Sequence, residues 1–231
     1  MKRESLNQLR EKNALSFMMY AYFGIANADN RFDVINASIN RAYRDAASHV
    51  LSFKNEEDKK SAKKQAKEKI DTAINQLKNC QDNYDKWHEC LCDDLIGIYK
   101  KYNFNDGYEF TYGIAQKWVN MTMKYLYVIY YFYSACGYYD SDFQLEFGQM
   151  IRRYAFDFHV PIDRVITEAA KNDFGISGNF KNWSKINTYD DYYSFEKAIK
   201  NHSSFDHDAC SAIRYSPIDW EGHAWIDTIM K

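Results

Sequence analysis

The chain has 231 residues, a formal net charge of −2, an aromatic content of 17%, and only nine glycines and two prolines. A chain of this length can bury a substantial core, and its many aromatic side chains exclude disorder over most of its length. The charge balance excludes a globally basic nucleic-acid-binding protein, so that any nucleic-acid contact has to come from a local patch.

The scarcity of helix breakers and the lack of any lasting apolar–polar alternation predict an all-α fold of about nine to eleven helices. Residues 1–231 are expected to form a single domain, and if it has two lobes the cleft is expected between 1–110 and 111–231. In chain order, helices are expected over 5–24 and 33–53, then up to about 99, over 112–136 and 142–157, from Pro161, over 189–200 and 206–213, and from Pro217.

Three segments interrupt this pattern. Residues 54–70 hold seven lysines and four acidic residues without large apolar side chains, which indicates a solvated helix face or a mobile arm. Residues 103–110 form the clearest loop, because Asp106 and Gly107 are a turn signal. Residues 174–185 are expected to be irregular.

The most apolar stretch is WVNMTMKYLYVIYYFYSACG at 118–137. It is long enough to cross a bilayer, but Asn120 and Lys124 lie one turn apart on one face, which favours a buried core helix. The polar first residues and the odd count of five cysteines indicate a cytoplasmic protein with free thiols. We expect a monomer without a membrane partner.

Histidine and cysteine residues do not predict a metal site or a cofactor. His88, Cys90 and Cys92 follow Cys80, but a C-x-C spacing on a helix turns the two thiols about 200° apart, which is poor geometry for tetrahedral zinc. The segment 202–210 collects two histidines and two aspartates without a known ligand spacing, and it is better explained as a helix entry.

Arg44 and His49 fit the pattern R-x₄-H, which resembles the signature of HEPN-type ribonucleases. In that family the arginine and histidine flank the scissile phosphate of RNA. The pattern is short and also fits an ordinary exposed helix face. A helical defence ribonuclease using these two residues, and an interaction protein without chemistry, remain the two alternatives to the function considered below.

The segment 112–127 is the richest in chemistry. Gln116, Asn120 and Lys124 are four residues apart and share one face of the predicted helix. Gly113, Lys117 and Met121 lie on the adjacent face. Lysines on a buried helix are costly unless they are paired or used. Burial also favours the neutral form of a lysine amine, which is the nucleophilic form.

The only two prolines lie in HVPIDRV at 159–165 and YSPIDWE at 215–221. The second is explained as a helix start, because Ser216 can cap a helix whose first residue is Pro217. The first lacks such a cap, since Val160 precedes Pro161. Asp163 is therefore expected to have a further role.

Taken in order, these motifs resemble the helix-hairpin-helix DNA glycosylases, nearest to the archaeal 8-oxoguanine glycosylase branch. The matching residues are Gly113, Gln116-Lys117 and Lys124, then Val160-Pro161-Ile162-Asp163, and finally Pro217, Glu221 and Trp225. The chain departs from the family in lacking an LPGVG hairpin and the iron–sulfur cysteines. The 46-residue separation of Lys117 and Asp163 is also wider than in the family and requires an insertion such as 138–152.

The resemblance implies an enzyme that excises a damaged base, or a modified base of foreign DNA such as phage DNA, from double-stranded DNA with a flipped nucleotide. Lys117 would be the amine nucleophile, which permits strand scission, and Asp163 would stabilise the cationic sugar or move protons. The implied base pocket consists of Met121, Trp220, Glu221 and Trp225. The implied DNA contacts are Gly113, Gln116, Asn120 and Lys124, with a phosphate at the helix start near Thr111.

Overall fold

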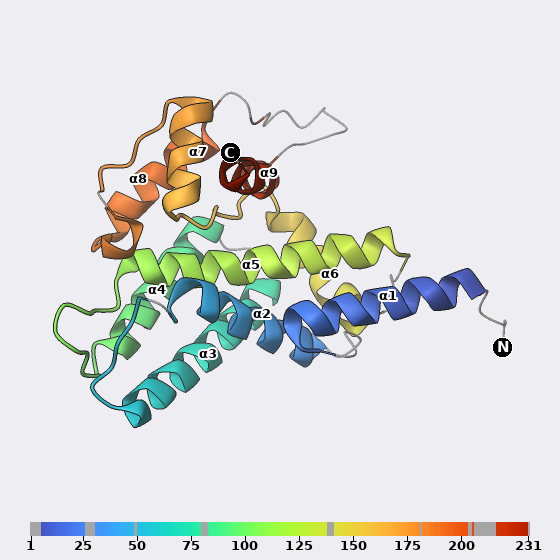
Figure 1. Cartoon of the computed structure of the whole chain (residues 1–231), viewed down its shortest axis with the longest axis horizontal. Coiled ribbons are helices and arrows are strands. Elements are labelled where there is room, and N and C mark those ends of the chain that lie inside the picture. Colours follow the sequence, from blue (N-terminus) through green and yellow to red (C-terminus); the bar gives the residue numbers. More distant parts are fainter. Residues whose placement is uncertain are drawn as a thin grey trace.

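The structure is a computed structural model that describes residues 6–25, 31–48, 50–79, 83–137, 141–180, 182–202, 205 and 216–230. Within these ranges it contains nine α-helices, one short 3-10 helix and no strand beyond a single bridge between Phe53 and Phe104 (Figure 1). The predicted all-α fold is confirmed.

The helices follow the order α1 (Leu6–Phe23), α2 (Arg31–Ala46), α3 (Glu56–Asn79), α4 (Tyr84–Tyr99), α5 (Tyr112–Ala135), α6 (Asp142–Tyr154), α7 (Arg164–Phe174), η1 (Trp183–Lys185), α8 (Tyr189–Lys200) and α9 (Pro217–Ile229). The lysine-rich segment is thus an ordered helix and not an arm. The helix predicted from Pro161 begins only at Arg164. The helix predicted over 206–213 lies outside the described residues.

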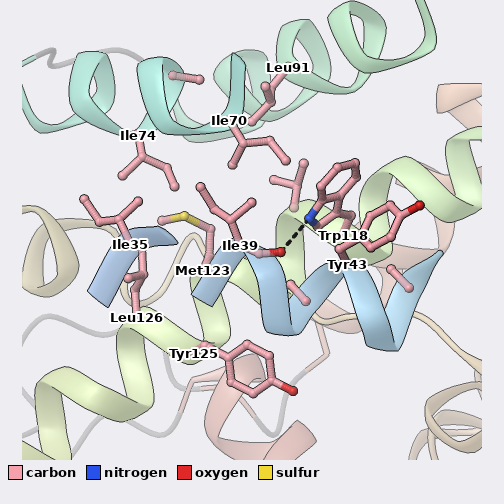
Figure 2. Close-up of a cluster of buried hydrophobic side chains, with 14 of the residues drawn as sticks. Ile35, Ile39, Tyr43, Ile70, Ile74, Leu91, Trp118, Met123, Tyr125 and Leu126 are labelled. Carbon is pink, nitrogen blue, oxygen red and sulfur yellow. Dashed lines mark hydrogen bonds between the residues drawn. The ribbon is translucent and has the colours of Figure 1, made fainter. Parts of the chain in front are cut away.

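Helix α5 runs through the middle of the molecule and packs on α2 (Figure 1). Figure 2 shows side chains of α2, α3 and α4 meeting those of α5 around Trp118, which is fully buried. The Trp118 indole donates a hydrogen bond to the Ile39 carbonyl at 3.0 Å, so its one polar atom is satisfied inside the core. Full burial of each isoleucine or leucine around Trp118, such as Ile39 and Leu91, stabilises the fold by roughly 1.5–3 kcal/mol.

The hydrophobic interior consists of two clusters. The first spans α1 to α6 and ends at Phe158, with Ile218 added from α9. The second begins at Val160 and is built by α7, α8 and α9 together with the segments between them. The boundary between the two clusters therefore falls near residue 159.

Helix α5 is buried against neighbouring helices along most of its length. No helix in the described ranges is long and apolar enough to cross a membrane. On α4, Cys90 is exposed and Cys92 is buried, so the two thiols face different directions, as their spacing predicts. The described residues bring together no cluster of three or more potential metal ligands, while Cys80 lies outside them.

Candidate active site

Lys117 and Asp163 converge as predicted, although 46 residues separate them in the chain. The Lys117 ammonium donates a hydrogen bond to Asp163 Oδ2 at 3.0 Å, and the two side chains are only 11% and 14% exposed. The Lys117 Nζ atom also lies 4.5 Å from the centroid of the Trp183 ring, a favourable cation–π distance. The lysine is therefore held by one carboxylate and one aromatic face.

Asp163 is also the N-cap residue of α7. Its backbone is extended, with φ −142° and ψ −173°, and its Oδ1 atom accepts a hydrogen bond from the Ile166 amide at 2.9 Å. Pro161 therefore lies before the helix and not at its first position. The cap that seemed to be missing before Pro161 is supplied by Asp163 itself.

Gln116 and Asn120 hold the segment that carries Asp163. The Gln116 side chain donates to the Ile162 carbonyl at 2.9 Å and accepts from the Ile162 amide at 3.2 Å. Asn120 donates to the Val160 carbonyl at 3.0 Å. Both side chains are completely buried, so the expectation that they contact DNA is wrong. They instead satisfy the backbone groups of an irregular buried segment, which otherwise lack partners.

Gly113 and the first turn of α5 are also unavailable to DNA. The Gly113 amide donates to the Ile186 carbonyl at 3.1 Å, and the Ile114 amide donates to the Thr111 hydroxyl at 3.3 Å. A Cβ atom at Gly113 would lie 1.7 Å from the Trp183 carbonyl oxygen. The expected phosphate site is wrong, because η1 packs directly on this turn.

The Lys117–Asp163 pair lies on the wall of a cavity of about 610 Å³. Its lining comes from α1 and α2 on one side and from α5, α9 and the start of α7 on the other. Apolar side chains predominate: Met18, Met19, Tyr22, Phe23, Met121, Tyr125, Val128, Ile129, Phe132 and Trp225. The cavity thus combines a large apolar surface with a few charged groups, as ligand sites commonly do.

A second ion pair lies in the same cavity. The Lys124 ammonium contacts the Glu221 carboxylate, which is only 1% exposed. Burial raises the pKa of Glu221, and the charge of Lys124 works against that rise. Lys124 therefore faces the cavity interior, where it can meet a ligand, rather than an outer DNA backbone.

Three of the four predicted pocket residues line the cavity, namely Met121, Glu221 and Trp225. Trp220 does not. It is 6% exposed, packs in the second hydrophobic cluster, and donates its indole hydrogen to Asp173 at 3.0 Å. Trp220 is thus a core residue of the second cluster that does not line the cavity, and its placement in the base pocket is wrong.

Sequence reasoning missed several neighbours of the site. Trp183 gave no spacing signal, because it lies in a segment that looks irregular. On α2, Arg41 and Asp45 form an ion pair at 3.5 Å that lines the cavity. Arg44 also lines it, although it was noted only for the nuclease pattern; its predicted partner His49 lies outside the described residues.

A buried polar network stands behind the site. His159 bonds to Asp85 at 2.8 Å and to the Tyr192 hydroxyl at 2.6 Å. Tyr192 in turn accepts a hydrogen bond from Asn120 at 3.0 Å. Burial lowers the pKa of His159 to about 4, against the opposing effect of the Asp85 hydrogen bond, so the imidazole is neutral at pH 7. The network links α4 and α8 to the segment that presents Asp163.

Comparison of the chain with models of known protein families, with curated proteins and with solved structures finds no match in any of the three.

Proposed function

We propose that the protein is a DNA glycosylase that excises a damaged or modified base, with Lys117 as nucleophile and Asp163 as its partner. The observation that carries this proposal is the 3.0 Å contact of Lys117 with Asp163 on the wall of a cavity of about 610 Å³. Enzymes that act on a base within a duplex flip the nucleotide into such a pocket. The cavity falls within the range of about 300–1,000 Å³ that is usual for small ligands.

The proposed reaction uses the two groups in turn. Asp163 accepts the hydrogen bond of the Lys117 ammonium and is placed to take its proton. The freed amine attacks C1′ as the glycosidic bond breaks, and the base leaves with the bonding electrons. The base receives the proton that Asp163 took from Lys117, which restores the Asp163 carboxylate beside the positive charge of the sugar–lysine adduct. Opening of the sugar ring then gives a Schiff base between Lys117 and the sugar, from which β-elimination cuts the strand.

The remaining charged groups are assigned to base recognition. Glu221 and Lys124 form a buried pair that presents both an acceptor and a donor to the cavity. Met121 and Trp225 supply apolar surface to the cavity wall. Polar groups in a dry pocket discriminate strongly, because a base that leaves them unpaired loses their hydrogen bonds.

The experiment is incubation with a panel of duplexes, each carrying one modified base, with the unmodified duplex beside them. Abasic sites are detected as alkali-sensitive breaks, and the Schiff base as a covalent complex trapped by borohydride. We expect Lys117→Gln to abolish trapping with its fold intact by circular dichroism, because an amide cannot form an imine. Gln can still donate a hydrogen bond to Asp163.

Lys124→Gln is the matched control, since it removes the other cavity lysine. We expect it to weaken binding of the base while trapping persists. Trapping that survives Lys117→Gln and disappears in Lys124→Gln would transfer the nucleophile to Lys124. Absence of base release from every duplex in the panel would refute the proposal.

A further inference from the structure

A second hollow, of about 490 Å³, lies between α2 and α3, outside the cavity. We call it the lysine groove. Its lining consists of Lys60, Lys63, Lys64 and Lys67 of α3, Asn36 and Asn40 of α2, and the acidic Glu68 and Asp71. Lysines at these positions fall on one face of the helix, because residues three, four and seven apart are neighbours on a helix surface.

Acidic residues neutralise this face only in part. Glu68 lies 4.0 Å from Lys64, while the described residues place no ion-pair partner beside Lys60, Lys63 or Lys67. The Lys63 ammonium lies 4.3 Å from the centroid of the Tyr43 ring. The groove therefore presents several lysine ammonium groups that have no ion-pair partner among the described residues.

The cations are close enough to affect one another. Burial lowers the pKa of Lys63, and so does repulsion from Lys67, Arg44 and Lys59. Crowding of like charges destabilises the folded protein, and a bound polyanion relieves it. Lysines on an ordinary solvated helix face are exposed, whereas Lys63 is half-buried.

Arg44 connects the lysine groove with the cavity. It lines the cavity beside Lys117, and its charge acts on Lys63 in the groove. It is exposed, so its guanidinium is accessible between the two sites. Arg44 is therefore a cation of the cavity wall that also acts on a lysine of the groove.

We propose that the lysine groove binds the phosphate backbone of the duplex whose flipped base enters the cavity, an inference that rests on the proposed function. Lys60 to Lys67 cover about 10 Å of helix axis, at roughly 1.5 Å per residue. Duplex DNA carries one charge per ~1.7 Å, so several phosphates fall within that length. The Asn36 and Asn40 amides add neutral donors from the α2 side of the groove.

The test is the salt dependence of duplex binding, measured by fluorescence anisotropy with a labelled, unmodified duplex. The slope of log K against log salt is negative, and each lost phosphate contact reduces its magnitude by about 0.9. Lys63→Gln with Lys67→Gln should therefore reduce the magnitude by about 1.8. The matched control is Lys171→Gln with Lys197→Gln, which removes two exposed lysines of α7 and α8. It should leave the slope unchanged.

The outcomes separate the groove from the chemistry. If the magnitude of the slope decreases equally in both double variants, or in neither, the proposal that the lysine groove binds the backbone is overturned, whether or not bases are released. A slope change with an RNA duplex that is absent with DNA also overturns it. If the magnitude of the slope decreases only in the groove variant, the result supports backbone binding by the lysine groove. A simultaneous failure to release any base would then refute the proposed function alone.

Discussion

Asp163 uses its two carboxylate oxygens for two different purposes. Oδ1 caps α7 through the Ile166 amide, while Oδ2 accepts the hydrogen bond from Lys117. Because the two contacts use different atoms, one substitution can remove the charge and leave the cap in place.

Asp163→Asn is expected to slow base release by about a hundredfold or more. Asn caps helices as well as Asp does, so α7 should start unchanged. The lost charge can no longer stabilise a cationic sugar, and groups aimed at developing charge are typically worth about 3–4 kcal/mol. Single-turnover release from the best duplex, with thermal unfolding beside it, measures both effects.

Asp219→Asn in the second PID motif is the control. Asp219 forms a capping box with Ser216, and its other oxygen accepts the Tyr127 hydroxyl at 2.6 Å. Asn keeps one of these two oxygen acceptors and loses the other, so the substitution should cost about 1 kcal/mol of stability, as a lost hydrogen bond does, without changing the rate. Small and equal rate changes in the two variants would leave Asp163 a capping residue only.

Glu196 should make stability depend on pH. It is completely buried, which raises its pKa to about 8 in spite of Lys200 and the hydrogen bond from the Val160 amide. Since this carboxyl holds its proton more tightly when folded, its contribution is fully present below its ordinary pKa and is lost as the pH rises toward 8.

Glu196→Gln is therefore expected to flatten the loss of thermal stability on going from about pH 5 to pH 9. The amide keeps the oxygen that accepts from Val160 and cannot ionise. Melting temperatures of the parent protein and the Glu196→Gln variant, measured across this pH range, test the expectation. A parallel decline in the two proteins would show that Glu196 does not titrate as described.

Individual residues were predictable where one helix carries the signal. Lys117, Met121 and Lys124 share α5 with its apolar periodicity, so their convergence on one site follows from helical spacing. Trp183 and Arg41 were not predictable, because only tertiary packing brings η1 and α2 to that helix. Gln116 and Asn120 were misjudged, since the sequence does not show that 160–162 would need their amides.

Among the elements, η1 is positioned by one glycine of α5. The contact of Gly113 with the backbone of Trp183 leaves no room for a side chain. The same contact places the Trp183 ring beside the Lys117 ammonium. The position of the Trp183 ring beside Lys117 thus depends on the close contact between the backbones of α5 and η1.

Gly113→Ala is expected to destabilise the protein by about 1–3 kcal/mol, as overpacking does, and to lower base release by moving Trp183 away from Lys117. The control is Gly97→Ala on α4, where a new Cβ meets nothing within 4 Å. That change should stabilise the protein by about 0.5–1 kcal/mol. Chemical denaturation of both variants is the measurement, and a neutral Gly113→Ala would contradict the tight contact.

The helices themselves were largely predictable, because runs without breakers end at clear signals such as the turn at Gly107, whose φ is +82°. The start of α7 was misplaced by three residues. Proline is common at the first position of a helix, so Pro161 was interpreted as a helix start. The N-cap of α7 is instead Asp163. The order of α3 was underestimated, since the buried side chains of its lysine-rich first part are the small Ala62 and Ala66, and larger ones follow only from Ile70.

At the scale of the whole molecule, the site lies where the two hydrophobic clusters meet. Lys117 belongs to a helix of the first cluster, and Asp163 opens a helix of the second. The network of Asp85, His159, Tyr192 and Asn120 crosses this boundary. Its hydrogen bonds therefore fix the distance between the two halves of the candidate site.

Asn120→Leu should loosen this junction. It removes the donor to the Val160 carbonyl, to Gln116 and to Tyr192, and each orphaned buried group costs about 1–3 kcal/mol. We expect faster hydrogen exchange in 160–174, retained protection in α2, and slower base release. Thr122→Val is the control, because the Thr122 hydroxyl bonds only within α5, to the Trp118 carbonyl at 2.8 Å. Equal exchange in both variants would exclude a role for Asn120 at the junction.

Three methionines, Met18, Met19 and Met121, form part of the cavity wall. Unbranched thioether side chains rearrange at little cost and fit irregular shapes, whereas branched or aromatic walls impose one outline. Selection by size is then weak at this wall, and substituents of different bulk can be accommodated there. Discrimination falls instead to the fixed charges of Lys124 and Glu221, so that the range of acceptable ligands is set by their hydrogen-bonding pattern more than by their volume.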